Sequence, residues 1–268
     1  MFGRLVKYDF RSMFKQFGFI WPAALLLALV NHFTLSGLDS TSAVGETTAG
    51  MAMLVYVAIL MAMFIITMIF VIQRFFKGLL GDEGYLMHTL PVRPWQLISS
   101  KLLSAVAATL LSIVVAVFSI LLIAPVQWVP ELGTLFRGLG YLFTHWNIHA
   151  THGVFFLLEL LLLLCAGMAQ GYLQLYLSMA VGHLFNRNRV AMSVAAYIAI
   201  HAVMGALLGV LGSINFRPLR AALDVLSGME GMAGAHVALW IAIVWTGLLS
   251  ALYFFCTEYI LRRRLNLE

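Results

Sequence analysis

Six apolar stretches, each close to the length needed to cross a bilayer, alternate along this chain with shorter polar segments. A helix that crosses the hydrocarbon core needs about 20 mostly apolar residues. The pattern predicts six membrane-spanning helices, over residues 17–35, 50–73, 102–124, 153–180, 190–211 and 235–257. The expected fold class is therefore an all-α polytopic membrane protein, with residues 1–268 forming a single transmembrane domain.

The residues before the first span form an element of their own. Apolar side chains recur there at helical spacing from Phe2 to Phe17, and four basic residues fall on the other side: Arg4, Lys7, Arg11 and Lys15. Such a helix lies in the membrane interface with its basic face toward anionic headgroups. We therefore predict an interfacial helix over residues 1–16. The alternative is a cytoplasmic extension of the first span.

The basic residues also predict the orientation of the spans. Thirteen of the sixteen lie before the first span, between spans two and three, between spans four and five, or after span six. The segments on the opposite side hold the other three, Arg137, Arg217 and Arg220. Because basic residues are retained in the cytoplasm, both termini are expected inside. The closing residues Arg262, Arg263 and Arg264 are then topology anchors and contacts for the inner leaflet.

Composition agrees with a membrane protein and excludes other classes. Hydrophobic residues make up 62% of the 268 residues and charged residues 10%, whereas a soluble domain carries about 25% charged residues. The net charge of +5 does not indicate nucleic-acid binding, because the basic residues flank apolar spans and form no basic soluble face. Cys165 and Cys256 lie within apolar runs and have no disulfide or metal-ligand spacing.

The polar segment 81–101, between spans two and three, contains the most specific pattern in the chain. Asp82 can cap a short helix over Glu83–His88, because its carboxylate accepts bonds from backbone N–H groups. Pro91 ends that helix, and Pro94 suits the first turn of the next one. The pattern predicts a short cytoplasmic helix that lies across the membrane normal and is rigidly joined to the third span.

The run Glu83–Val92, followed by Trp95-Gln-Leu-Ile and Lys101-Leu-Leu, resembles the permease subunits of the type-2 ABC exporter family, especially those of Gram-positive anaerobic bacteria. Arg93 departs from the family, which more often has a small polar residue there. The resemblance implies six spans, an interfacial N-terminal helix and a coupling helix that receives force from a cytoplasmic ATPase. The coupling residues it implies are Asp82, Glu83, Gly84, Tyr85, Leu86, Met87, His88 and Pro91.

The resemblance also implies partners and a location. A second permease, identical or related, and a separate ABC ATPase would complete the exporter in the bacterial cell membrane. The segment Gly78–Gly84 lacks the lysine of a phosphate-binding loop, so ATP and magnesium are expected on the partner subunit. Hydrolase motifs are absent too, and we expect neither enzymatic activity nor a cofactor or metal in this chain. The expected substrate is amphipathic or lipid-like, with antimicrobial peptides or drugs as candidates.

Polar residues inside the spans are the remaining candidates for a site. Glu159 is a carboxylate deep in an apolar run, where a charge is costly. Gln170 and Gln174 follow on the same helical face, and His201 lies in the middle of span five. These residues could line a translocation path or contact the partner permease. The alternatives are a protonated or outward-snorkelling Glu159, glutamines that bond helices together, and a His201 that only packs.

Two other functions fit the same sequence. One is an ion-coupled secondary carrier in which Glu159 binds the proton. The other is a membrane scaffold or sensor subunit that transports nothing.

Three histidines, His145, His149 and His152, could line one helix face as zinc ligands do, but no carboxylate or cysteine accompanies them. We interpret them as interfacial residues.

Overall fold

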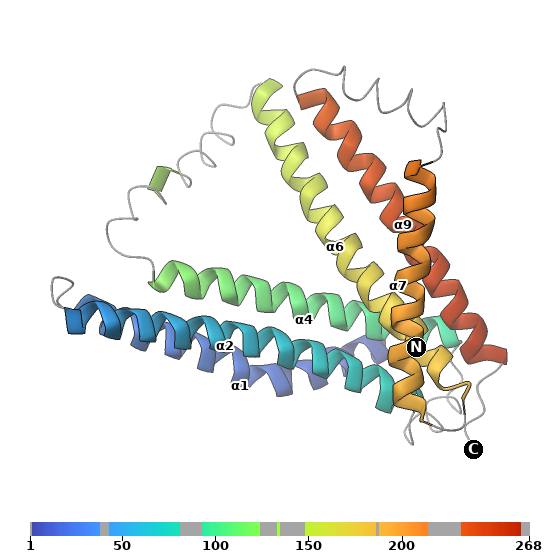
Figure 1. Ribbon diagram of the computed structural model, residues 1–268, viewed down its shortest axis with the longest axis horizontal. Helices are drawn as coiled ribbons and strands as arrows, with labels where there is room; N and C mark the ends of the chain where they lie inside the picture. Colours follow the sequence, from blue (N-terminus) through green and yellow to red (C-terminus); the bar gives the residue numbers. More distant parts are fainter. Residues whose placement is uncertain are drawn as a thin grey trace. The chain divides into compact units, whose positions relative to one another are not determined.

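The described part of the chain, in a computed structural model, consists almost entirely of long helices (Figure 1). It covers residues 2–37, 43–80, 93–123, 133–134, 148–185, 188–213 and 232–263. The long helices are α1 (Phe2–Gly37), α2 (Ala43–Phe75), α4 (Pro94–Ile123), α6 (Ile148–Gly182), α7 (Arg189–Ser213) and α9 (Met232–Arg263). Within the described ranges, these six are long and apolar enough to cross a membrane, which confirms the all-helical fold and the expected number of spans. The chain is a multi-pass membrane protein.

Helix α1 differs in one respect from the sequence-based picture. It runs without a break from Phe2 to Gly37, with Pro22 inside it. Transmembrane helices tolerate such a proline because neighbouring groups can satisfy the freed carbonyl. The predicted separate interfacial helix over residues 1–16 is therefore not confirmed, and the unbroken helix has the form of the alternative, an extension of the first span.

By packing, the chain divides into two compact units. One contains Met1–Arg74 and Leu103–Tyr141, and the other contains Phe75–Leu102 and Leu142–Glu268. The boundary crosses α2 at its last residues and crosses α4 after its first turns, so both helices contribute to both units. The predicted single permease domain over residues 1–268 stays a prediction.

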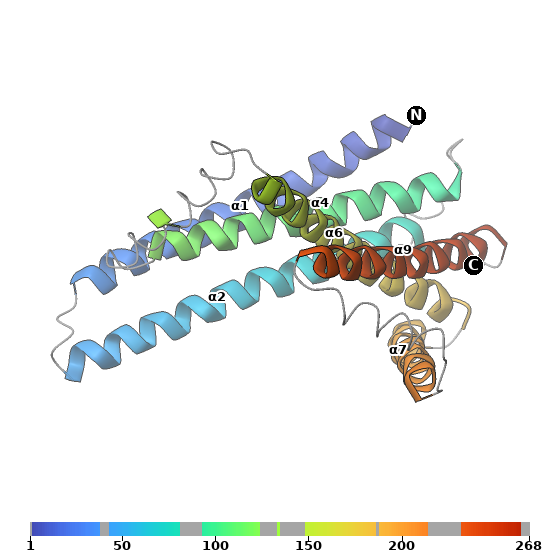
Figure 2. The ribbon, with the colours of Figure 1, turned by 90° about the horizontal axis from the view of Figure 1, so that it is seen from above.

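In the first unit, α1, α2 and α4 run side by side in both views (Figures 1 and 2). Three clusters of buried side chains follow one another along these helices, and each includes a small alanine. They consist of Met13, Phe17 and Ala108, then Ala24, Met63 and Ala116, then Ala28, Tyr56 and Ile123. Small residues let helix backbones approach closely, which gives dispersion contacts where no hydrophobic effect drives association.

Hydroxyl groups on α4 add polar bonds to this packing. The Trp21 indole donates to the Ser112 hydroxyl at 3.1 Å, and the Tyr56 and Ser119 hydroxyls lie 2.7 Å apart. Thr67 lies 3.3 Å from the same Ser112. Interhelical bonds of this kind are worth about 0.6 kcal/mol each in a membrane, so they supplement the apolar contacts and fix which faces meet.

In the second unit, α6 packs against both α7 and α9. Helices α6 and α7 approach closely at Gly182, where an added Cβ would lie 2.6 Å from both the Cα and the backbone nitrogen of Ser193. The connection between these helices ends at Asn188, whose φ of 57° is in the left-handed region that asparagine tolerates. Its carbonyl accepts a bond from the Met192 N–H at 3.0 Å, which begins α7.

Candidate functional site

The coupling residues predicted from the sequence lie outside the described residues. They fall within 81–92 and comprise Asp82, Glu83, Gly84, Tyr85, Leu86, Met87, His88 and Pro91. Their role stays a prediction. The helical turns on either side of this segment are described, and both belong to the second compact unit.

On the N-terminal side, the segment is preceded by η1 (Phe76–Leu80), a π-helical turn that continues α2. Phe75 stacks on Tyr176 of α6 with ring centroids 3.9 Å apart, and both side chains are fully buried. Phe76 meets the ring of His183 edge-on at 4.9 Å. A buried aromatic pair contributes about 0.5–1.5 kcal/mol beyond the area it buries, so these contacts fasten the end of α2 to α6.

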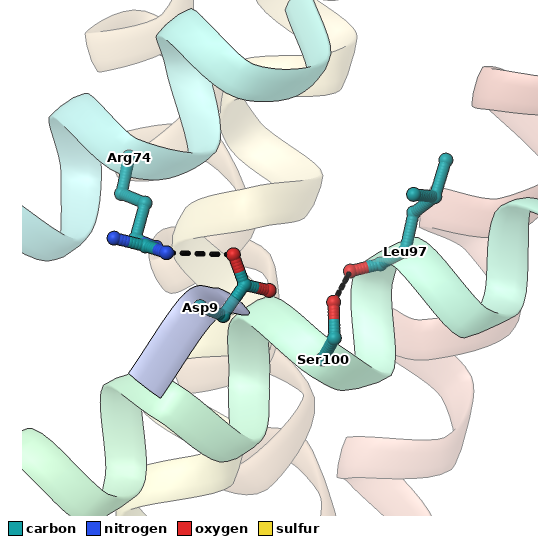
Figure 3. A network of polar contacts seen from close by, with 4 residues as sticks. All are labelled: Asp9, Arg74, Leu97 and Ser100. Atoms are coloured by element: carbon teal, nitrogen blue, oxygen red, sulfur yellow. Dashed lines mark hydrogen bonds and ion pairs between the residues drawn. The ribbon is translucent and has the colours of Figure 1, made fainter. Parts of the chain in front are cut away.

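On the C-terminal side, Pro94 begins α4, as the two-proline pattern predicts. Leu97 and Ile98 are fully buried in its first turns, and the Ser100 hydroxyl donates to the Leu97 carbonyl at 3.0 Å (Figure 3). The buried Lys101 side chain lies against η1, since a Cβ added at Gly78 would lie 3.4 Å from its Cε. Both ends of segment 81–92 are thus held on one packed base.

His183 belongs to this base, and its surroundings disfavour the charged imidazolium. Burial lowers the pKa of His183 below its ordinary value, an effect partly offset by its bond to the Met179 carbonyl and reinforced by the charge of Arg189. The ring nitrogen Nδ1 lies 3.1 Å from that carbonyl oxygen and donates to it. The neutral imidazole therefore predominates at pH 7, and the contact with Phe76 is made without a charge.

In the first unit, an ion pair joins the beginning of α1 to the end of α2. The Arg74 guanidinium donates to the Asp9 carboxylate at 2.6 Å, as Figure 3 shows. The Asp9 side chain is 1% exposed and that of Arg74 is 12% exposed. Arg74 also lies over the Phe70 ring at 5.8 Å. Because the pair is withdrawn from water, removing either partner leaves a buried charge uncompensated.

Glu159 is the centre of a second polar cluster, between α6 and α9. Its Oε2 lies 2.6 Å from Nδ1 of His236, and its Oε1 accepts a bond from the Trp240 indole at 2.9 Å. Nε2 of His236 is buried and bonds to no described residue. The ring of His152 lies 5.6 Å from the His236 ring. Both carboxylate oxygens of Glu159 are therefore paired, one with His236 and the other with Trp240.

The other predicted residues of the spans do not join Glu159. Gln174 lies 2.7 Å from Nδ1 of His201, which stacks on Tyr197 with ring centroids 5.5 Å apart. Gln170 is half-buried on α6. Gly205 and Gly209, on the same face of α7 as His201, meet nothing within 4 Å in the described part of the chain. Whether these residues line a path or contact a partner stays a prediction.

The predicted lipid anchors are placed where a charged side chain remains accessible. Arg4, Lys7, Arg11 and Lys15 are all exposed, and they alternate along α1 with the buried side chains of Asp9, Met13 and Phe17. Arg262 and Arg263 end α9 and are exposed, with Arg263 over the Tyr259 ring at 5.5 Å. Arg264 lies outside the described residues.

Two members of these clusters were missed by sequence reasoning. Asp9 is the one acidic residue among four bases on α1, and its burial depends on a partner 65 positions away. His236 lies near the start of α9, 77 positions from Glu159. The usable signal was Glu159 itself, because a carboxylate in an apolar run requires a partner. A histidine near the end of another span would have been a reasonable choice for that partner.

Comparisons with protein-family models, with curated proteins and with solved structures find no match to this chain.

Proposed function

We propose that this chain is the membrane-spanning permease subunit of an ATP-driven exporter of the type-2 ABC class. Both termini face the cytoplasm of a bacterial cell, and a second permease and two ATPase subunits complete the assembly. The substrate is amphipathic or lipid-like. Segment 81–92 transmits force from the ATPase, and Glu83–His88 form the docking helix.

The observation that carries the proposal is the anchored base beneath segment 81–92. Force applied to a flexible loop would be dissipated. Here Phe75 and Phe76 hold one end against α6, and Lys101 packs on Gly78 at the other end. A push on the segment would therefore move α2, α4 and α6 together at their inner ends. The π-helical turn η1 supports this role, since such turns recur at functional sites.

The thirteen-to-three distribution of basic residues supports the orientation that the proposal needs. It favours an orientation in which segment 81–92, both termini and the α6–α7 connection lie on the same side of the membrane. An ATPase in the cytoplasm could then reach Leu86 and the residues around it.

The docking role of segment 81–92 predicts that a charge at Leu86 uncouples the chain from its ATPase. The chain would be co-expressed with an ABC ATPase of the same genome, purified in mild detergent and assayed for co-elution and ATP hydrolysis. Leu86→Asp is expected to weaken co-elution by about tenfold or more, because an unpaired charge would be desolvated in the interface.

Leu184→Asp provides the matched control for that experiment. Leu184 is exposed in the α6–α7 connection, on the same predicted side of the membrane, and lies outside segment 81–92. It should co-elute as the unaltered chain does. Equal co-elution of the Leu86→Asp variant, or failure of the ATPase to bind the unaltered chain, would contradict the proposal.

The pairing of Glu159 with His236 favours a second candidate, an ion-coupled carrier. A carboxylate and an imidazole 2.6 Å apart inside a membrane could exchange a proton with a passing substrate. This candidate needs no ATPase. The non-transporting scaffold has no comparable observation in its favour.

Transport by the purified chain alone separates these candidates. In proteoliposomes with an imposed proton gradient, we expect no accumulation of a fluorescent amphipathic cation such as ethidium. Gradient-driven accumulation that Glu159→Gln abolishes, and that Trp240→Phe retains, would establish the carrier instead. Trp240→Phe is the control because it removes one bond to the carboxylate and leaves the contact between Glu159 and His236 intact.

A further inference from the structure

Helices α1 and α2 line an open cavity of about 300 Å³ near the ends that residues 38–42 connect. Most of its lining is apolar and comes from both helices, including Leu27, Val30, Val55 and Ile59. Its rim is open to the surroundings, because Val30, Met51 and Val55 are each more than half exposed. In a membrane, those surroundings are lipid.

One polar side chain of the lining is buried without a bond. Asn31 is 8% exposed, and its amide nitrogen has no hydrogen-bond partner among the described residues. Two hydroxyl groups of the lining are already hydrogen-bonded. The Tyr56 hydroxyl bonds with Ser119 at 2.7 Å, and the Thr34 hydroxyl donates to the Val30 carbonyl at 2.9 Å. A buried donor without an acceptor is destabilising, so a ligand that brings an acceptor would be bound favourably there.

The depth of Asn31 identifies the acceptor. It lies four residues before the predicted end of the first span, which is about 6 Å along a helix. The hydrocarbon core is about 30 Å thick in a bilayer about 40–45 Å thick overall. Asn31 is therefore close to the boundary where the ester carbonyls of lipids lie, and Leu27 and Ile59 extend the cavity from there into the hydrocarbon region.

We propose that this cavity binds an acyl chain of an ester-linked membrane lipid, with the Asn31 amide donating to the ester carbonyl. Its volume equals about ten water molecules at roughly 30 Å³ each, enough for part of one acyl chain. The apolar lining contacts the chain, and Asn31 selects the linkage. The site requires only that α1 and α2 span a membrane, so it stands apart from the proposed exporter function.

The test compares two phospholipids that share headgroup and chain length and differ only in linkage. Purified protein in detergent would be titrated with the diester and with the diether lipid, and bound lipid counted by native mass spectrometry. The unaltered chain should bind the diester about fivefold more tightly, because an ether oxygen accepts hydrogen bonds more weakly than a carbonyl. Asn31→Leu should remove that preference, whereas His32→Leu, at the same depth and outside the lining, should keep it.

A second variant tests the cavity without altering its polar group. Ala52→Leu adds bulk to the lining and should weaken binding of both lipids to a similar extent. Three results would overturn the proposal: equal binding of the two lipids by the unaltered chain, a diester preference that survives Asn31→Leu, or undiminished binding by Ala52→Leu.

Discussion

Replacing Gly182 by alanine is expected to destabilise the protein, although the same substitution elsewhere on α6 should be harmless. The new methyl group would lie 2.6 Å from the Cα and backbone nitrogen of Ser193, closer than real Cβ atoms come to such atoms. A backbone cannot rotate away as a side chain can, so α6 and α7 must separate. Overpacking of this kind costs about 1–3 kcal/mol, and valine should cost more than alanine.

Gly171→Ala is the matched control for Gly182→Ala. A Cβ at Gly171 meets nothing within 4 Å in the described structure, so no contact opposes it. Alanine should stabilise the helix there by about 0.5–1 kcal/mol, because glycine loses more backbone freedom on folding. Thermal unfolding of the purified variants in detergent measures both effects. If Gly182→Ala unfolds at or above the unfolding temperature of Gly171→Ala, Gly182 does not lie as close to the Ser193 backbone as the structure indicates.

Ser193→Gly refines the same test. It removes the hydroxyl that the alanine methyl group would also meet, but the two backbone atoms of residue 193 remain. The double variant of Gly182→Ala and Ser193→Gly should therefore recover only part of the stability that Gly182→Ala alone loses. Because His183 follows Gly182 and contacts Phe76, separation of α6 from α7 should also loosen the base beneath segment 81–92. A weakened co-elution with the ATPase would be the functional counterpart.

The spans were predictable because bilayer thickness sets the length of an apolar run. The course of α1 was not predictable in the same way. A basic face at Arg4, Lys7, Arg11 and Lys15 is expected both for a helix lying in the interface and for one that extends a span, because helical spacing is identical in the two cases. Burial of Asp9 and Met13 beside other helices shows how the first residues of α1 pack, and it depends on contacts distant in sequence.

The sequence allowed individual polar residues of the clusters to be predicted, but not which of them would contact each other. Glu159, Gln174 and His201 were recognised because polar groups in a membrane are costly, but their spacing did not say which would meet. Gln174 and His201 come together, whereas Glu159 pairs with His236. Among the described glycines, a close approach to the backbone of another helix is found at Gly182, whereas Gly205 and Gly209 meet nothing within 4 Å. Gly182 ends α6, where a glycine is also expected as a helix terminator, so its packing role was not evident.

The ion pair between Asp9 and Arg74 predicts a strong energetic coupling between α1 and α2. Asp9→Asn should lower the free energy of unfolding by about 3–5 kcal/mol, because Arg74 would keep its charge in a buried site. Arg74→Met should have a similar cost, since it leaves the Asp9 carboxylate buried. Arg11→Met is the control: Arg11 is exposed on the same helix, and its loss should change stability by no more than about 0.5 kcal/mol.

The double variant of Asp9→Asn and Arg74→Met decides whether the charges act as a pair. Neither charge remains in it, so its loss of stability should be clearly smaller than the sum of the two single losses. Arg74→Lys should lose less stability than Arg74→Met. Lysine keeps the charge but lacks the planar guanidinium, which bonds one carboxylate oxygen of Asp9 and lies over Phe70. Each free energy of unfolding is measured in detergent, with the loss of the far-ultraviolet circular dichroism signal as the readout. Strictly additive losses would mean that the two residues stabilise α1 and α2 independently, and that no ion pair holds the start of the chain to the helix that leads into segment 81–92.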